Sequence, residues 1–328
     1  MTENIEITTN ETNIGKSKFT NDDLKEMQAM TLDQKIALSL TKIAEFNNKF
    51  ALKTYISLSG GKDSTVLLHL VRKLYPNIPA VFIDTGLEFP EIKEFALSQP
   101  NVVRLRPKMS FRQVIETYGY PLVSKQEAAK IRKLRHSNIS DKYRNYLLNG
   151  DERGKYGMLA KKWQFLVNIP EDISEKCCDV MKKAPAHQYE KETGRYPITG
   201  QMACESRLRK KIWLDYGCNI YEGNRIKSNP LSFWIEQDVL EYLVKFNVPY
   251  CSVYGEIKQD KNGKYYTTGE HRTGCIFCGF GCHLEDEPNR FQRLKETHPK
   301  LWEYCMKDWD DGGLGMKKVL DYINVKTE

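Results

Sequence analysis

The chain has 328 residues, of which 40% are hydrophobic and 28% charged, as expected for a soluble globular protein with a sizeable core. No apolar run approaches the length of a membrane span and no signal peptide opens the sequence, so we expect a cytoplasmic protein without membrane contact. The net charge of +7 is compatible with an anionic partner such as a nucleotide or RNA, although solvated lysines alone can produce it. Nine cysteines in a cytoplasmic chain favour metal or redox chemistry over disulfides.

The first stretch, residues 1–20, is polar and rich in Asn, Thr and Glu, which predicts a disordered tail. Residues 21–50 follow with apolar side chains that fit a helix. Within them, Thr31-Leu32-Asp33-Gln34 has the pattern of a capping box, in which the first and fourth side chains satisfy each other's backbone N–H groups. We therefore expect an N-terminal helical segment that covers an edge of the core.

Residues 54–74 have the pattern of a strand, a glycine-rich turn and a helix. An apolar run at 54–58 is interrupted by Ser59-Gly60-Gly61-Lys62-Asp63-Ser64, and apolar residues with helical spacing follow at 66–74. Two glycines let the backbone approach a ligand closely, and the positive end of the helix dipole favours an anion. Lys62 adds a full charge, so the turn predicts a site for phosphate or pyrophosphate. A glycine turn without a ligand is the alternative.

Further strands are predicted at 79–83, 101–105 and 197–201. The roughly 25 residues from the first strand to the second fit a right-handed crossover between parallel strands. Because ligands of parallel sheets bind at the carboxyl ends of the strands, Asp84-Thr85-Gly86 should lie beside the glycine turn. We expect Asp84 to contact a nucleotide or Mg²⁺, and a simple strand-end turn is the alternative.

These elements indicate an α/β fold with a parallel sheet and helices on both faces. We assign a nucleotide-binding domain to residues 51–250, and a cysteine-cluster and helical region to residues 251–328. Two basic clusters, at 130–136 and 207–211, either face a nucleic acid or form solvated surfaces, and the sequence does not separate these interpretations.

Cys275 and Cys278 form a Cys-x-x-Cys pair in a glycine-rich turn, a spacing that brings two thiolates to one metal ion or cluster. One pair supplies only two ligands, so the others must come from elsewhere in the chain. Four thiolates serve both a tetrahedral zinc ion and an iron–sulfur cluster, so spacing alone leaves the choice open. The remaining cysteines are Cys177, Cys178, Cys204, Cys218, Cys251, Cys282 and Cys305.

The glycine turn at 59–64 resembles the PP-loop of the ATP pyrophosphatases, the adenine nucleotide alpha hydrolase superfamily, which cleave ATP between its α and β phosphates. From about residue 54 to 282, the chain is also similar to the phosphoadenosine phosphosulfate (PAPS) reductase family of that superfamily. The resemblance rests on the order of Cys177-Cys178, Lys182-Lys183, Pro185, Thr199-Gly200-Gln201, Arg207, Arg209, Pro230-Leu231, Trp234, Asp238-Val239, Val248-Pro249-Tyr250, Gly274, Cys275 and Cys278.

This resemblance implies a set of site residues. In the adenosine phosphosulfate (APS) reductases of the family, a Cys-Cys pair and a Cys-x-x-Cys pair bind one [4Fe–4S] cluster, which maps onto Cys177, Cys178, Cys275 and Cys278. The alternative is zinc, with Cys282 as the fourth ligand in place of Cys178. ATP and Mg²⁺ are the other implied cofactors, with Lys62 and Asp63 in catalytic roles. The implied nucleotide-binding residues are Ser59, Gly60, Gly61, Lys62, Asp63, Ser64, Asp84, Thr85, Gly86, Gly200 and Arg207.

Two departures from the reductases bear on function. The reductases carry a nucleophilic cysteine in a short C-terminal segment, whereas no cysteine follows Cys305 here. The intact glycine turn is more like members that bind whole ATP, and residues 66–70 with 84–86 are similar to the small subunit of ATP sulfurylase. We therefore predict an enzyme that cleaves ATP at the α–β bond to adenylate an acceptor for sulfur transfer. Related ATP-dependent enzymes modify tRNA or support DNA phosphorothioation.

The predicted sulfur carriers are Cys282, as a catalytic residue, and Cys204, for which an inert thiol is the favoured interpretation. Expected partners are an adenine nucleotide, tRNA or DNA as acceptor, a cysteine desulfurase or thiol reductant, and a second copy of the chain. One alternative function is a PAPS or APS reductase that releases sulfite. Another is a non-catalytic module that binds a nucleotide or nucleic acid.

Overall fold

The computed structural model describes residues 17–154, 156–223 and 226–328, so most of the predicted disordered tail lies outside the described residues. Thr20 accepts a hydrogen bond from the backbone N–H of Asp23 and begins helix α1 (Asn21–Ala29). Helix α2 (Leu32–Lys49) begins at Thr31, and the expected capping box with Gln34 is present.

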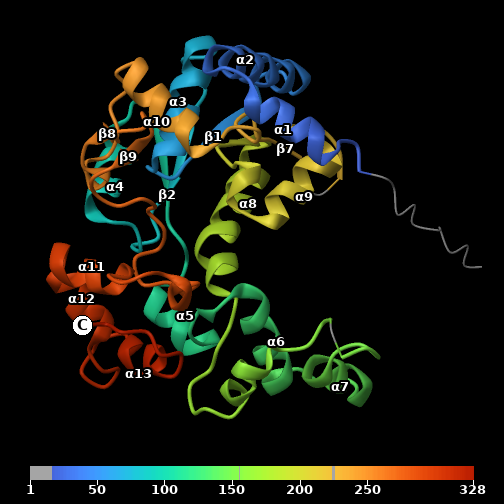
Figure 1. The fold of residues 1–328 in the computed structure, drawn as a ribbon, viewed down its shortest axis with the longest axis vertical. Coiled ribbons are helices and arrows are strands. Elements are labelled where there is room, and N and C mark those ends of the chain that lie inside the picture. Colours follow the sequence, from blue (N-terminus) through green and yellow to red (C-terminus); the bar gives the residue numbers. More distant parts are fainter. Residues whose placement is uncertain (1–16, 155, 224–225) are drawn as a thin grey trace, which may run out of the picture.

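A six-stranded sheet lies in the upper part of the molecule in Figure 1. Its strands run parallel, except that the edge strand β6 is antiparallel to β7. The chain places β2 on one side of β1 and later places β5 on the other side, so the strand order reverses at β1. The carboxyl ends of parallel strands form a crevice for ligands at such a reversal. In sheet order, the strands are β3 (Val102–Leu105), β2 (Ala80–Ile83), β1 (Thr54–Leu58), β5 (Tyr196–Thr199), β7 (Lys227–Ser228) and β6 (Asn219–Ile220).

Helices cover both faces of this sheet. Successive strand residues point to opposite sides, and apolar side chains on both sides are buried under helices. On one face, Ile56 and Phe82 belong to a core that also contains residues of α2, α3 and α10. On the other face, Tyr55 and Val81 pack with Tyr189 of α8. The predicted α/β fold with a parallel sheet is confirmed. The helices named here are α3 (Lys62–Leu74), α8 (Ala184–Thr193) and α10 (Glu236–Lys245).

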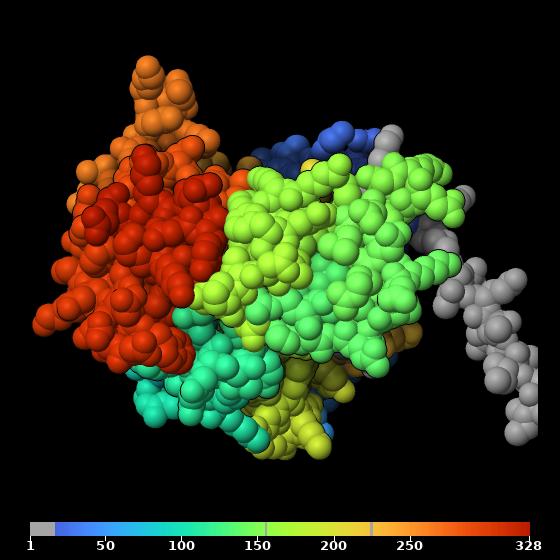
Figure 2. Space-filling view, turned by 90° about the horizontal axis from the view of Figure 1, so that it is seen from below, coloured from blue at the N-terminus to red at the C-terminus, as the bar shows by residue number. Residues whose placement is uncertain are grey.

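A second hydrophobic core joins segments that are far apart in the sequence and forms the lower part of Figure 1. Val114 and Ile131 belong to it, together with Phe291 and Val319 from the C-terminal helices. Figure 2 shows the face that these segments build together. The elements are α5 (Phe111–Tyr118), β4 (Leu122–Val123), α6 (Lys125–His136), α7 (Asp141–Asn149), β10 (Gly279–Phe280), α11 (Arg290–Thr297), α12 (Pro299–Met306) and α13 (Met316–Asp321).

Residues after 250 thus share the second core with α5 and α6, and the predicted division of the chain at residue 250 stays a prediction. None of the described helices is both long and apolar enough to cross a membrane. The remaining elements are α4 (Pro90–Ser98), η1 (Lys161–Val167), η2 (Asp179–Lys183), η3 (Ala203–Glu205), α9 (Arg207–Tyr216), η5 (Ser252–Tyr254), β8 (Ile257–Gln259), β9 (Tyr265–Thr267) and η6 (Cys282–Leu284).

A buried ion pair ties α2 to α10. Lys35 is 1% exposed, and its Nζ donates to both carboxylate oxygens of Asp238, at 2.8 and 2.7 Å. Lys35→Met keeps an apolar side chain there but leaves a buried carboxylate without its cation. We expect the free energy of unfolding, measured by urea denaturation, to fall by about 3–5 kcal/mol.

Lys42→Met is the matched control on the same helix. Lys42 pairs with Glu45 near the surface, where its side chain is 30% exposed, and such pairs contribute about 0–1 kcal/mol. Equal losses in the two variants would contradict a structural role for the Lys35–Asp238 pair.

Candidate functional site

The glycine loop, residues 59–64, connects the carboxyl end of β1 to helix α3. Helix α3 begins at Gly61 without a side-chain cap, so its first backbone N–H groups need other acceptors. The Ser59 and Ser64 hydroxyl oxygens lie 3.0 Å apart, and the Ser64 hydroxyl accepts from the Ser59 backbone N–H at 3.2 Å. The loop therefore combines a helix N-terminus with the strand reversal, as an anion site requires.

Two glycines allow neighbouring backbone to close on this loop. Gly60 has φ of +75°, and a Cβ atom there would lie 2.8 Å from both the Cγ2 atom and the carbonyl oxygen of Ile92. At Gly200, which follows β5, a Cβ atom would lie 3.1 Å from the carbonyl oxygen of Asp63. At residue 60, only glycine adopts the positive φ easily and also fits in the space beside Ile92. Gly200 allows the turn after β5 to lie against the first turn of α3.

Lys62 is 4% exposed and contacts acceptors of the protein itself. Its backbone N–H donates to the Tyr254 hydroxyl at 3.2 Å, and its Nζ donates to the carbonyl oxygen of His271 at 2.8 Å. The same Nζ lies 3.1 Å from a carboxylate oxygen of Glu236. The predicted phosphate-binding cation is thus in the loop, and residues from beyond position 250 contact it.

Asp63 is partly buried, and its Oδ1 atom is buried without a hydrogen-bond partner among the described residues. Burial raises the pKa of this carboxyl, whereas the charges of Lys62, Arg272 and Arg209 oppose that shift. A buried carboxylate oxygen without a partner needs an explanation, and at a phosphate-binding loop a divalent cation is a suitable one.

A cavity of about 630 Å³ extends from the glycine loop along the sheet face that α8 covers. Ser59, Thr273 and Gly274 line one part of it, and Tyr55 and Glu190 line another. The Tyr55 hydroxyl donates to the Glu190 carboxylate at 2.7 Å. The volume lies in the range of small-molecule sites, roughly 300–1,000 Å³. No cysteine is among the described residues that line it.

The turn after β2 is less suited to a cation than the sequence suggested. Asp84 accepts hydrogen bonds from Arg104, and Lys93 lies 3.2 Å from the same carboxylate. Burial raises the pKa of Asp84, but hydrogen bonds from Arg104 and Lys93 outweigh it and lower the pKa overall. These cations favour the simpler interpretation of Asp84 as a strand-end residue. Thr85 and Gly86 are outside the cavity lining, and their nucleotide contacts stay predictions.

Helix α9 brings Arg209 to the glycine loop, whereas Arg207 begins the helix in an exposed position. Arg209 pairs with Glu205 and interacts electrostatically with Asp63. Its pKa is lowered, first by burial and then by the charge of Arg272. The sequence motif contained both arginines, and the rotation of the helix decides between them. The structure therefore favours Arg209 over the predicted Arg207.

The structure brings together Cys177, Cys178, Cys275 and Cys278, which line one small cavity with otherwise largely apolar walls. The Cys177 thiol donates to the Cys178 sulfur at 4.0 Å, and this hydrogen bond, with the Lys125 and Lys182 ammonium groups, lowers the pKa of Cys178 to about 5. Burial raises the pKa of Cys278 to about 11. Within the described ranges, no three His, Cys, Asp or Glu side chains are placed to hold a single metal ion.

The two predicted sulfur carriers lie outside the walls of both cavities. Cys282 is 2% exposed, its thiol donates to the Gly279 carbonyl oxygen at 3.1 Å, and burial raises its pKa to about 12. Cys204 is an exposed residue, but its thiol is partly buried, and this burial raises the pKa of the thiol. Arg272 and Asp63 also interact with it electrostatically. Neither thiol is poised to ionise, so their catalytic roles stay predictions.

Lys182 lines both cavities and therefore lies between them. It belongs to the π-helical turn η2, and its Nζ lies 4.0 Å from a Glu88 carboxylate oxygen. Burial lowers the pKa of Lys182, but the Cys275 thiol and the Glu88 carboxylate raise it overall. The sequence offered Lys182 only as a motif residue, because no local pattern places it against Cys275.

The basic helix α6 uses much of its charge inside the protein. Arg132 forms hydrogen bonds with Glu175, the shortest at 2.8 Å. Arg135 donates to two backbone carbonyl oxygens of the 169–171 segment, at 3.0 and 2.7 Å. Lys130 lies 2.7 Å from the carboxylate of Glu127. These contacts favour a structural role for α6, and nucleic-acid binding stays a prediction.

Comparisons with known proteins agree on one family. The model of the phosphoadenosine phosphosulfate reductase domain matches residues 53–154 and 149–282. An uncharacterized protein of Methanocaldococcus jannaschii is 28% identical over 262 residues, 78% of this chain and 47% of that protein. This chain thus spans about half the length of that relative.

Two further relatives carry names of enzymes. Phosphoadenosine 5′-phosphosulfate reductase of Xanthomonas axonopodis pv. citri is 25% identical over 272 residues, 82% of this chain and 87% of that protein. Sulfate adenylyltransferase subunit 2 of Allorhizobium ampelinum is 27% identical over 221 residues, 64% of this chain and 58% of that protein.

Gly60→Ala tests the fit of the glycine loop against α4. The new Cβ combines a positive φ with two contacts of 2.8 Å. Gly86→Ala is the matched control, because Gly86 has φ of +73° but open space around its Cβ position. We expect urea denaturation to show a loss of about 1–2 kcal/mol at Gly86, and a loss about 1–3 kcal/mol larger at Gly60. Equal losses would show that the contact with Ile92 carries no energy.

Asp63→Asn tests whether burial of the Asp63 carboxylate lowers the stability of the folded protein. A carboxyl whose pKa is raised on folding loses stability as pH rises through the folded pKa, and neutral Asn avoids this loss. We expect the melting temperature of the variant to exceed that of the wild type by roughly 2–4 °C at neutral pH, with no gain at acidic pH. Thermal unfolding of both proteins, measured from acidic to neutral pH, gives these melting temperatures. A variant that melts below the wild type at neutral pH would contradict a raised pKa for Asp63.

Proposed function

The chain belongs to the phosphoadenosine phosphosulfate reductase domain family, and from this premise we propose that it is a nucleotide-binding enzyme that cleaves ATP between the α and β phosphates. The cleavage adenylates an oxygen of an acceptor and prepares it for replacement by sulfur. According to their names, both kinds of relative act on adenylyl compounds, so the names alone do not separate cleavage of ATP from reduction of a sulfonucleotide.

The observation that carries this proposal is the glycine loop at one part of a 630 Å³ cavity whose described lining contains no cysteine. A sulfonucleotide reductase needs a thiolate that attacks the substrate sulfur, whereas ATP cleavage needs only binding groups and positive charge. The volume suits a nucleotide, and the loop offers donors for its phosphates. The site therefore supports cleavage of ATP better than reduction of a sulfonucleotide.

The residues of the loop have distinct roles in the proposed reaction. Backbone N–H groups of the first turn of α3 and the hydroxyls of Ser59 and Ser64 bind the phosphate oxygens. Lys62 stabilises the negative charge that develops as the α–β bond breaks. The unpartnered Oδ1 of Asp63 would hold Mg²⁺, and a bound Mg²⁺ would supply positive charge for the phosphate oxygens.

The proposed reaction has two steps, adenylation of the acceptor and replacement of its oxygen by sulfur. An acceptor oxygen attacks the α phosphorus, the bond from that phosphorus to the α–β bridging oxygen breaks, and pyrophosphate leaves; any proton on the attacking oxygen passes to water. The terminal sulfur of a persulfide from a cysteine desulfurase then displaces AMP from the carbon or phosphorus atom that carried the oxygen, and a thiol reductant cleaves the resulting disulfide. AMP and the sulfur-containing acceptor are the products.

The four clustered cysteines fit an iron–sulfur cluster in their chemistry. They are four thiols around one cavity, with Lys125 and Lys182 near Cys178 to favour thiolate. We propose that Cys177, Cys178, Cys275 and Cys278 hold a [4Fe–4S] cluster. When bound, a cluster supplies electron-transfer chemistry, and the cysteines themselves bring the residues before η2 against the turn at 275–278.

A sulfonucleotide reductase is the second candidate, because the reductase from Xanthomonas matches 82% of this chain. In that case the cavity binds PAPS or APS, and a thiol from elsewhere reaches the sulfate group of that nucleotide.

The acceptor in the first candidate function is a base or the backbone of tRNA or DNA. The internally paired cations of α6 argue against that helix as its main binding surface.

The deciding experiment uses anaerobically purified full-length protein. One sample receives ATP with Mg²⁺ and candidate tRNA or DNA acceptors, and another receives PAPS or APS with a thiol reductant; pyrophosphate and sulfite are measured in both. We expect pyrophosphate with AMP and no sulfite, and a loss of at least about tenfold in rate for Lys62→Ala. Sulfite without ATP cleavage would overturn the proposal, and nucleotide binding without turnover would indicate a binding module.

Iron and acid-labile sulfide are measured in the same samples. Cys178→Ser should lose bound iron, because it removes one of the four clustered thiols, whereas Cys204→Ser should retain it. Equal iron contents in these two variants would contradict the assigned ligands.

A further inference from the structure

The strap, residues 269–273, crosses the glycine loop between β9 and Cys275. Its backbone is joined to the preceding helical turn: Gly269 donates to the Tyr254 carbonyl oxygen at 2.9 Å, and Glu270 donates to the Val253 carbonyl oxygen at 3.0 Å. At its other end, the Thr273 hydroxyl lies 2.8 Å from the Tyr254 hydroxyl. Tyr254, which is 2% exposed, and the strap therefore form one unit.

This unit supplies the glycine loop with the kind of acceptors that a phosphate supplies. The Tyr254 hydroxyl accepts from the Lys62 backbone N–H at 3.2 Å, and the His271 carbonyl oxygen accepts from Lys62 Nζ at 2.8 Å. A Cβ atom on Gly61 would lie 3.2 Å from the Tyr254 hydroxyl oxygen and 3.4 Å from that of Thr273. The Tyr254 hydroxyl thus occupies a place beside the first N–H of α3, where a helix-bound anion puts an oxygen.

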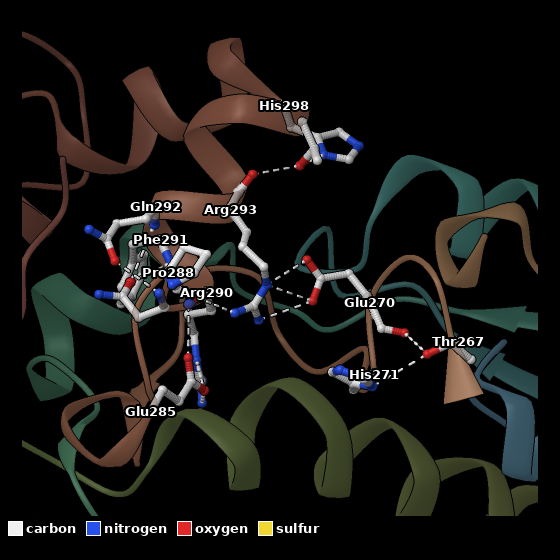
Figure 3. A network of polar contacts seen from close by, with 12 residues as sticks. Thr267, Glu270, His271, Glu285, Pro288, Arg290, Phe291, Gln292, Arg293 and His298 are labelled. Atoms are coloured by element: carbon white, nitrogen blue, oxygen red, sulfur yellow. Dashed lines mark hydrogen bonds and ion pairs between the residues drawn. The ribbon is translucent and has the colours of Figure 1, made fainter. Parts of the chain in front are cut away.

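Arg293 of helix α11 reaches the Glu270 carboxylate of the strap, as Figure 3 shows. The Arg293 guanidinium donates to the Glu270 carboxylate from Nε at 3.2 and 3.3 Å and from Nη2 at 3.1 Å. The Thr267 hydroxyl donates to the carbonyl oxygen of Glu270 at 3.1 Å. The side chain of Arg293 is 36% exposed and that of Glu270 is 12% exposed, so this ion pair is partly solvated.

We propose that Tyr254 and the strap hold the glycine loop closed upon itself, with the Tyr254 hydroxyl in the place of a phosphate oxygen, and that nucleotide phosphates bind as the strap moves off the loop. The inference rests on the proposed function, because it concerns the entry of phosphate to the same loop. An internal acceptor that competes with a ligand lowers its apparent affinity by the fraction of open molecules. Removal of the competing hydroxyl therefore strengthens phosphate binding, whereas loss of a direct ligand or of a structural support weakens it.

The test is calorimetric titration of the full-length, anaerobically purified protein with magnesium pyrophosphate. Tyr254→Phe removes the competing oxygen and leaves the ring, so we expect a dissociation constant lower than that of the wild type by roughly three- to tenfold. Tyr250→Phe is the matched control, because the Tyr250 hydroxyl accepts from the Ile257 backbone N–H at 3.1 Å, away from the loop. We expect it to bind like the wild type.

Arg293→Gln provides a second variant that leaves the glycine loop unchanged. It removes the charged fastening of Glu270, so it should also tighten binding of pyrophosphate. Tighter binding by both Tyr254→Phe and Arg293→Gln supports the strap. Equal or weaker binding by Tyr254→Phe overturns it and leaves the proposed function standing if the wild type binds pyrophosphate. No binding by any of the four proteins overturns both.

Discussion

The first turn of helix α3 exposes backbone N–H groups that have no acceptor within the helix, and the rest of the site is arranged around them. Gly60 allows the loop to pass against α4 with a positive φ, which points these groups into the crevice at the strand reversal. In the structure the Tyr254 hydroxyl meets one of them, and Lys62 Nζ is bound by the His271 carbonyl oxygen. Lys62 Nζ also lies 3.1 Å from a carboxylate oxygen of Glu236, so the groups that the proposed phosphate would contact are already bound by acceptors of the protein, one of them charged.

The second constraint is the convergence of two distant cysteine pairs on one cavity. Cys177 and Cys178 precede the turn η2, and Cys275 and Cys278 follow the strap. Cys177 belongs to the second hydrophobic core, and Cys178 and Cys275 pack against it. Helix α11 takes part in both neighbouring features: Arg290 donates to the Cys278 carbonyl oxygen at 2.9 Å, and Arg293 fastens the strap through Glu270 (Figure 3). The cysteine turn and the strap are therefore both bound by helix α11 and are adjacent in the sequence.

The charge of the protein is less informative than its magnitude suggests. The net charge of +7 counts each lysine and arginine alike, whereas Arg132 and Arg135 are engaged by carboxylates and carbonyl oxygens within the fold. Asp84 is likewise surrounded by cations and offers little to Mg²⁺, while Asp63 has a buried oxygen without a partner among the described residues. Cations lie near both acidic residues, and hydrogen bonding separates them: Asp84 accepts from Arg104, whereas no described residue bonds Asp63 Oδ1.

The sequence by itself determined the parts that depend on local chemistry. Strand periodicity and spacing predicted β1, β2, β3 and β5, the capping pattern predicted the start of α2 at Thr31, and the order of glycines, Lys62 and Asp63 predicted the loop at the end of β1. Tertiary structure alone decided that Arg209 is close enough to Asp63 to interact with it electrostatically, that Lys182 lies between two cavities, and that the Tyr254 hydroxyl accepts from the Lys62 backbone N–H. These outcomes depend on helix rotation and on contacts between residues as far apart as Lys62 and His271. Such contacts are set by how two hydrophobic cores pack, which no local pattern encodes.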